Sequence, residues 1–302
     1  MSFFSKARNY CLAHIVLSRR LDRFSDEKVL RFIYWFSLGK KLNTQDPVTY
    51  TEKMQWLKLN DRKDIYTAMV DKSTAKDFIS DRIGKAHVIP TLGIWAHFSE
   101  VDFDKLPDSF VLKCTHDSGS CVICKSKQSF DKEKYSAYFE ERLHRNYYFN
   151  YREWPYKNIQ PRIVAEPYMH DASGTGAEDL TDYKFFCFNG EPKFMYITQE
   201  KSKLPYVDIF DMEFNRLPFS LGDPASDSVI SRPTHFEEMR DMAVKLSAGI
   251  PHLRVDFYVV DDIVYVGELT FFHSAGFPKI EPPEWDEIIG SWLNLPNSNI
   301  KK

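Results

Sequence analysis

The spacing of apolar residues along the chain changes near Val88, and this change restricts the possible fold classes more than any other feature of the sequence. Before Val88, apolar residues recur at helical spacing, whereas after it short apolar runs alternate with turn residues, which is typical of hairpins. We therefore expect an α+β fold with mostly antiparallel sheets, rather than a doubly wound parallel sheet. The predicted helices before the change cover residues 26–38, capped by Asp26, residues 51–59, and residues 72–83, capped by Asp71.

Three pairs of strands are expected after the change. Strands over 110–115 and 121–125 flank a short polar turn, and Asn189-Gly190, the strongest turn signal of the chain, joins a second pair over 183–188 and 193–199. The third pair covers 253–259 and 263–270. Other expected elements are strands over 88–92, 93–97 and 162–168, helices over 131–145 and 236–248, and irregular segments over 171–179 and 202–228.

Composition excludes some classes of protein. The chain has 302 residues, of which 43% are hydrophobic, and a formal net charge of -3, which argues against nucleic acid as a partner. Its five cysteines, odd in number and mostly in apolar runs, predict free thiols in a reducing cytoplasm. Residues 1–22 are basic around an apolar centre. They favour an ordinary first helix packed on the domain; peripheral contact with the inner face of the membrane is the alternative.

The last pair of strands carries the first candidate site. Side chains two residues apart share a face of a strand, so Arg254 and Asp256 point the same way, as do Glu268 and Thr270. Pairing of the strands would bring Asp256 opposite Glu268. Two inward carboxylates repel each other unless a cation or a shared proton lies between them, and their oxygens suit magnesium. The alternative is a solvated strand face with a salt bridge from Arg254 to Glu268.

Two further sites follow from charges placed in apolar strands. Lys113 ends a buried run just before residues 116–120, where the backbone N–H groups of Ser118, Gly119 and Ser120 are suited to cradle phosphate oxygens. The alternative is a plain hairpin with a lysine that extends to solvent. Lys184 and Glu166 also lie in apolar runs, where each needs a partner of opposite charge, either in a ligand or in one mutual salt bridge.

In chain order, eight segments resemble the TupA-like branch of the ATP-grasp superfamily, found among bacterial capsule, teichuronopeptide and O-antigen biosynthesis proteins. The resemblance runs from about Tyr50 to Leu295. It implies an ATP-grasp fold in which two α+β subdomains, 85–168 and 169–302, clasp ATP after a helical N-terminal region over 1–84. The segments are 50–56, 71–72, 110–119, 153–157, 165–168, 182–190, 254–257 and 267–270.

The resemblance also implies roles for single residues. The residues implied to contact ATP are Lys72, Lys113, His116, Ser118, Gly119, Ser120, Ala165, Glu166, Tyr168 and Asp182. The implied catalytic residues are Lys184 and Arg254, and the implied magnesium ligands are Asp256, Glu268 and Thr270. Thr270 stands where the family usually has Asn, and the 116–120 loop has one glycine where many relatives have more. His273 is open to two interpretations, acceptor recognition or an ordinary structural histidine.

The implied function is that of a carboxylate–amine ligase that uses ATP and Mg²⁺ through an acyl phosphate. The implied partners are a carboxylate-bearing sugar or glycan, such as a uronic acid, and an amine such as an amino acid. Three alternatives remain: a sugar kinase, a glycosyltransferase, and a non-catalytic scaffold with a degenerate ATP site.

Overall fold

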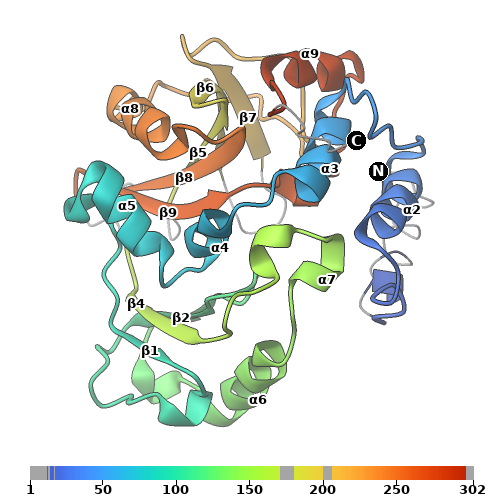
Figure 1. The fold of residues 1–302 in the computed structure, drawn as a ribbon. Helices are drawn as coiled ribbons and strands as arrows, with labels where there is room; N and C mark the ends of the chain where they lie inside the picture. The colour runs from blue at the N-terminus through green and yellow to red at the C-terminus, as the bar shows by residue number, and fades with distance from the viewer. Residues whose placement is uncertain (1–11, 13, 17, 171–179, 200–205, 297–302) are drawn as a thin grey trace.

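A computed structural model describes residues 12, 14–16, 18–170, 180–199 and 206–296. The chain forms two sheets, one of four strands in the order β1-β4-β2-β3 and one of five in the order β7-β6-β5-β8-β9. Every pairing within the two sheets is antiparallel. The fold is therefore α+β, as predicted, and Figure 1 shows the five-stranded sheet above the four-stranded one.

The four-stranded sheet has its own hydrophobic core. Phe139 of the covering helix and Phe110 and Leu112 of the sheet are fully buried in it. The strand expected over 88–92 does not form: Val88 makes an isolated bridge to Val266, and Pro90 has no N–H to donate to a ladder. The elements are β1 (Gly93–Trp95), β2 (Phe110–Cys114), β3 (Val122–Cys124), β4 (Ile163–Pro167) and the helix α6 (Lys132–Leu143).

The five-stranded sheet contains the two later hairpins as predicted, with Asn189 and Gly190 both at positive φ in the first turn. One of its edge strands lies inside the segment expected to be irregular. That strand carries a buried charge, Asp208, which pairs with Arg216 at 3.0 Å and interrupts the apolar pattern. The strands are β5 (Asp182–Phe188), β6 (Glu191–Gln199), β7 (Tyr206–Asp211), β8 (His252–Val260) and β9 (Ile263–Thr270).

Helices from both ends of the chain share one core with the five-stranded sheet. Gly290 allows a close approach at this junction, because a Cβ there would lie 2.3 Å from the carbonyl oxygen of Val48. Figure 1 shows α4 and α7 between the two sheets. The helices outside the four-stranded sheet are α2 (Asp26–Leu38), α3 (Tyr50–Asn60), α4 (Asp64–Val70), α5 (Ala75–Ile83), α7 (Tyr148–Tyr151), α8 (Phe236–Ser247) and α9 (Glu284–Trp292). Short 3₁₀ turns are η1 (Lys85–His87), η2 (Phe98–Glu100), η3 (Lys127–Ser129), η4 (Trp154–Tyr156) and η5 (His273–Gly276).

One helix start differs from the prediction in a way that affects the site. Asp71 does not cap a helix that begins at residue 72; its carboxylate accepts the backbone N–H of Ser73 at 2.9 Å, and α5 begins only at Ala75. This local turn competes with the helix, as short polar side chains commonly do. Lys72 consequently lies in the turn before α5 instead of within the helix.

Part of the expected N-terminal segment lies outside the described residues, including Lys6 and Arg8. Of the described part, Leu12 and Val16 are buried against Val29 and Ile33 of α2. This contact is the one expected of a helix packed on the domain. Within the described ranges, no helix has both the length and the apolar character that crossing a membrane requires.

Candidate functional site

The last hairpin brings the two expected carboxylates together. In the register of β8 and β9, Asp256 stands opposite Glu268 and Arg254 opposite Thr270. Asp256 is almost completely buried, whereas the side chain of Glu268 remains 33% exposed. The hairpin therefore presents one buried and one accessible carboxylate.

Two cations hold the buried carboxylate. Arg254 donates to both oxygens of Asp256, at 2.6 and 2.7 Å, and Lys184 on the neighbouring strand β5 donates to Oδ2 at 2.9 Å. Burial alone would raise the pKa of Asp256, but the two cations hold that pKa below its usual value. The alternative of a solvated strand face is wrong for β8, where Arg254 and Asp256 are buried, but its ion pair between Arg254 and Glu268 is present at 3.8 Å.

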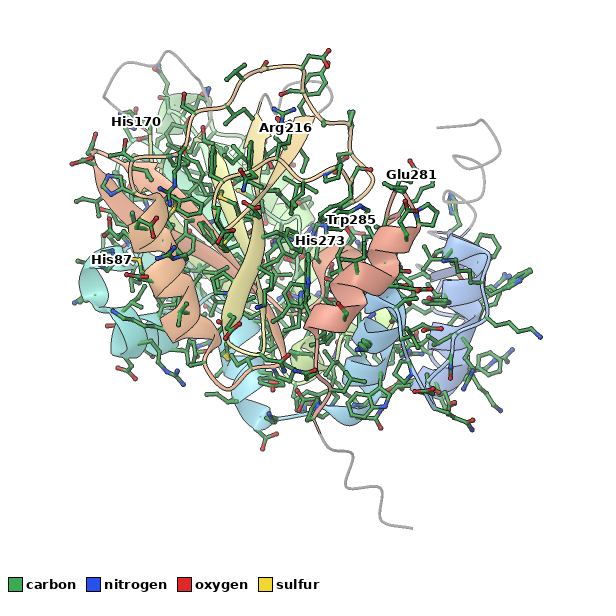
Figure 2. The ribbon with its side chains drawn as sticks, turned by 90° about the horizontal axis from the view of Figure 1, so that it is seen from above. His87, His170, Arg216, His273, Glu281 and Trp285 are labelled. Atoms are coloured by element: carbon green, nitrogen blue, oxygen red, sulfur yellow. The ribbon has the colours of Figure 1, made fainter. Side chains whose placement is uncertain are left out.

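The guanidinium of Arg254 is fixed from a third side by His273. Its Nη1 donates to His273 Nδ1 at 2.8 Å, and its Nη2 donates to the Thr270 hydroxyl at 3.0 Å. Burial, and then the charge of Arg254, lower the pKa of His273 well below its usual value, so the ring is neutral and accepts. Figure 2 shows His273 in the interior of the chain. His273 is thus a positioning residue for Arg254. The hydroxyl of Thr270 is bound by the same guanidinium.

Lys72 links this hairpin to the 116–120 loop. Its Nζ donates to the backbone carbonyl of Asp117 and lies 4.0 Å from Glu268 Oε1. Its backbone N–H donates to the carbonyl of Thr115 at 3.1 Å. The turn before α5 therefore places a cation between the loop and the accessible carboxylate.

Two residues of the 116–120 loop that were implied to contact ATP, Ser120 and His116, use their side chains to hold the shape of the loop. The Ser120 hydroxyl accepts the Cys114 N–H at 2.8 Å and donates to Asp117. His116 is buried, and its Nε2 lies 3.2 Å from the carbonyl oxygen of Arg142. Ser118 and Gly119 are exposed at the tip, with Gly119 at φ +82°. The tip is the part of the loop that a ligand can reach.

Glu166 is held by two lysines of other elements. Lys113 of β2 and Lys76 of α5 donate to its two oxygens at 2.6 and 2.7 Å. Their charges outweigh burial and lower the pKa of Glu166. The mutual salt bridge between Glu166 and Lys184 is therefore wrong as a prediction, because Lys184 pairs with Asp256 and, at 3.5 Å, with Asp182. Lys76 was not predicted, although it lies four residues after Lys72.

A mainly apolar cavity of about 190 Å³ lies beside this cluster, between the end of β4 and β8. Lys113, Glu166, Tyr168 and the exposed Cys121 line it. A smaller cavity of about 30 Å³ shares Lys113 and Glu166 with it and extends to Lys72 and Glu268. Ala165 lines neither cavity, because it lies inside β4 and its carbonyl accepts the Leu92 N–H.

These cavities and charges fit a nucleotide bound with a divalent cation. The apolar cavity suits a base, and Lys113 and Lys72 lead from it to Glu268 as a phosphate chain requires. Magnesium takes carboxylate oxygens and completes its shell with phosphates and water. Glu268 is the accessible carboxylate of the pair, whereas both oxygens of Asp256 accept hydrogen bonds from Arg254 and Lys184.

Two buried charged residues near the site had no predicted role. Lys58 of α3 donates to the carbonyls of Tyr151 and Ala275, and burial lowers its pKa to about 7. Burial likewise raises the pKa of Glu153 to about 7, and Lys58 counteracts this. The sequence signal that could have identified Lys58 is its position as a lysine in an otherwise apolar stretch of a predicted helix.

The buried ring of His252 predicts a loss of stability in acid. Burial lowers its pKa from 6.5 to about 4, so at pH 5 the folded chain leaves it neutral while the unfolded chain protonates it. Unfolding then takes up a proton, and stability falls as the pH falls, by about 2 kcal/mol between pH 8 and pH 5. Urea unfolding should show a weaker pH dependence for His252→Gln. The exposed His144→Gln should behave as wild type, and an unchanged pH dependence in His252→Gln would contradict this assignment.

The α+β fold thus places two opposed carboxylates and several lysines around a pair of adjoining cavities. A sequence model of the TupA-like ATP-grasp family matches residues 52–294. The chain therefore belongs to the TupA-like ATP-grasp family. No curated protein is significantly similar to it.

Solved ligase structures resemble the chain only distantly. D-alanine–D-alanine ligase from Bacillus anthracis is 18% identical, with 67% of this chain and 56% of that chain covered and a TM-score of 0.41. The Helicobacter pylori D-alanine–D-alanine ligase is 11% identical, with 76% and 61% covered and a TM-score of 0.42. The ATP-grasp ligase PsnB with its minimal precursor is 11% identical, with 68% and 53% covered and a TM-score of 0.38. The chain spans less than two thirds of each of these proteins, and membership rests on the family match.

Proposed function

We propose that this chain is an ATP- and Mg²⁺-dependent ligase that joins a carboxylate to an amine. The observation that carries the proposal is the cluster at the last hairpin, where Lys184, Arg254 and Lys72 surround the Asp256–Glu268 pair. Such a cluster concentrates positive charge beside two hard oxygen ligands, which is what phosphoryl transfer requires. Membership of an ATP-grasp family supports the same conclusion.

Each part of the proposed ATP site has a residue suited to it. The base occupies the apolar cavity, with Tyr168 in its wall and the Lys113–Glu166 pair at one end. Lys72 and the tip of the 116–120 loop contact the phosphates. Glu268 and Asp256 hold Mg²⁺, which neutralises phosphate charge there.

In the proposed reaction, a carboxylate oxygen of the substrate forms a bond to the γ-phosphorus, and the bond from that phosphorus to ADP breaks. The amine nitrogen then forms a bond to the acyl carbon and loses a proton, and inorganic phosphate leaves. Lys184 and Arg254 neutralise the charge that builds up on the transferred oxygens. His273 keeps Arg254 in the orientation that this needs.

For substrates, we propose a carboxylate-bearing sugar such as a uronic acid and an amino acid, joined in the cytoplasm for a surface polysaccharide. The resemblance to proteins of capsule and O-antigen synthesis supports this choice.

Trapping with hydroxylamine tests the acyl phosphate. With ATP, Mg²⁺ and a panel of uronic acids but no amine, added hydroxylamine should give a hydroxamate and an equal amount of ADP. A stable phosphate ester without hydroxamate would indicate a sugar kinase instead. Absence of both products, together with no thermal stabilisation by Mg-ATP, would indicate a non-catalytic scaffold.

A further inference from the structure

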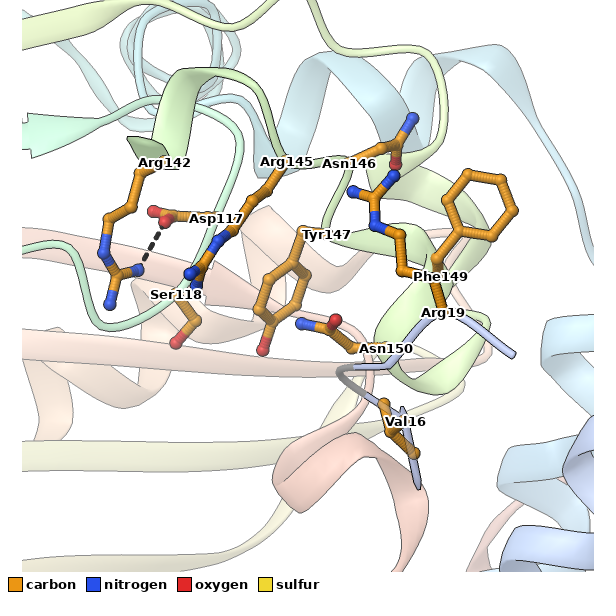
Figure 3. A pocket seen from close by; sticks show the side chains of 10 residues that line it. All are labelled: Val16, Arg19, Asp117, Ser118, Arg142, Arg145, Asn146, Tyr147, Phe149 and Asn150. Atoms are coloured by element: carbon orange, nitrogen blue, oxygen red, sulfur yellow. Dashed lines mark hydrogen bonds and ion pairs between the residues drawn. The ribbon is translucent and has the colours of Figure 1, made fainter. Parts of the chain in front are cut away.

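A third cavity, of about 300 Å³, opens on the 116–120 loop beside α6 and α7. Three arginines line it: Arg142 in the last turn of α6, Arg145 just after that helix, and Arg19 from the N-terminal segment (Figure 3). We call it the arginine cavity. It shares no lining residue with the two cavities of the proposed ATP site.

The arginine cavity carries an excess of positive charge. Asp117 is the one acidic residue in its wall, and it pairs with Arg142 at 2.7 Å. Arg145 pairs with Glu141 on the exposed surface of α6, where such a pair contributes little. Arg19 makes no ion pair within the described part of the chain, and its guanidinium lies 5.9 Å from the ring of Phe149. Two of the three guanidiniums are therefore available to an anion.

Neutral groups in the same wall suit a ligand rich in hydroxyl groups. The amides of Asn146 and Asn150 and the hydroxyls of Ser118 and Tyr147 offer donors and acceptors, and Phe149 adds an apolar face. Figure 3 shows Asn150 beside Tyr147, and Arg145 beside Ser118. Arginines provide charge and the amides and hydroxyls provide neutral hydrogen bonds, which together match an anionic sugar.

The arginine cavity is joined to the proposed reaction centre through one residue of the loop. Asp117 lines the cavity with its side chain, and its backbone carbonyl accepts from Lys72, which lies 4.0 Å from Glu268. A ligand in the cavity thus lies across the 116–120 loop from the carboxylate pair. That place suits an anionic group of the substrate other than the carboxylate that reacts with ATP.

We propose that the arginine cavity binds the anionic end, carboxylate or phosphate, of a hydroxyl-bearing substrate, with Arg19 and Arg145 as its charged contacts. The inference rests on the proposed ligase function for its substrate role, but the binding itself is independent of ATP. Arg142 is not assigned to the ligand, because it holds Asp117 and through it the loop.

Calorimetric titration without ATP tests the cavity with three probes: D-glucuronate, D-glucose 1-phosphate and D-glucose. We expect an anionic probe to bind and D-glucose not to bind measurably. Arg19→Gln and Arg145→Gln should each raise the dissociation constant at least about tenfold, the usual effect of losing a charge-assisted hydrogen bond. Arg20→Gln removes an exposed neighbouring charge that does not line the cavity and should leave the constant unchanged.

The probes and one further variant separate the outcomes. Preference for glucuronate identifies a carboxylate ligand, and preference for the sugar phosphate identifies a phosphate ligand; both support the proposal. Lys113→Met should weaken ATP binding without changing binding of the anionic probe, so a failure of the ATP site would not be mistaken for a failure of the cavity. Failure of both anions to bind, or binding unaffected by Arg19→Gln and Arg145→Gln, would overturn it.

Discussion

Replacing Asp256 by Asn should lower the rate of ADP release about a thousandfold, the scale seen when a preorganised charged group of an active site is removed. The buried carboxylate is the shared partner of Arg254 and Lys184, and it faces Glu268 across the hairpin. Its loss removes a proposed metal ligand and frees both cations from their common anchor. The rate should be measured with the substrate pair that gives the fastest ADP release in the wild-type chain.

Two further variants make the Asp256 result decisive. Asp261→Asn changes an exposed residue in the turn of the same hairpin and should keep the wild-type rate. Loss of the buried charge also destabilises the fold by about 3 to 5 kcal/mol, so Glu268→Gln is the second test. Glu268 is 33% exposed and has only long contacts to cations, so this variant should fold normally and still lose activity. Full activity in folded Asp256→Asn would show that the carboxylate pair is not the metal site.

Replacing Lys113 by Met should raise the dissociation constant of Mg-ATP about 30-fold, within the usual range for a lost hydrogen bond to a charged group. Lys113 lines both cavities of the proposed ATP site, and its ammonium is fixed by Glu166 at 2.6 Å. Because the ammonium is already held in place, little further conformational entropy is lost when a phosphate binds to it. The dissociation constant should be measured by calorimetry, with thermal unfolding to check that the variant is folded.

Lys125→Met is the matched control for Lys113, because Lys125 is exposed at the end of the neighbouring strand β3. It should bind Mg-ATP as the wild-type chain does. If both variants bound Mg-ATP equally weakly, the effect would come from the overall surface charge and not from a contact of Lys113. If Lys113→Met bound Mg-ATP as tightly as the wild-type chain, the nucleotide would bind elsewhere.

The parts of the fold that depend on neighbours in sequence were predictable. The Asn189-Gly190 turn predicted one hairpin, and the alternation of apolar and polar residues on either side of Asp261 predicted the last one. The position of Asp256 opposite Glu268 followed from that second hairpin. β7 was missed because the buried Asp208 resembles a loop residue until its partner Arg216 is known. The start of α5 was misplaced because Asp71 closes a local turn instead of a helix.

The partners of buried charges were not predictable, because they come from distant segments. Glu166 is held by Lys76, 90 residues earlier in the chain, and no periodicity connects the two. The arginine cavity likewise joins Arg19 to the end of α6. The roles assigned to single site residues, and the domain boundaries at residues 84 and 168, remain predictions.

The most direct test of the central claim is calorimetric titration of the wild-type chain with ATP in the presence and absence of Mg²⁺. We expect one ATP bound per chain, with an affinity that rises when Mg²⁺ is present because Glu268 and Asp256 would hold the metal beside the phosphates. No heat of binding and no thermal stabilisation at millimolar Mg-ATP would contradict it.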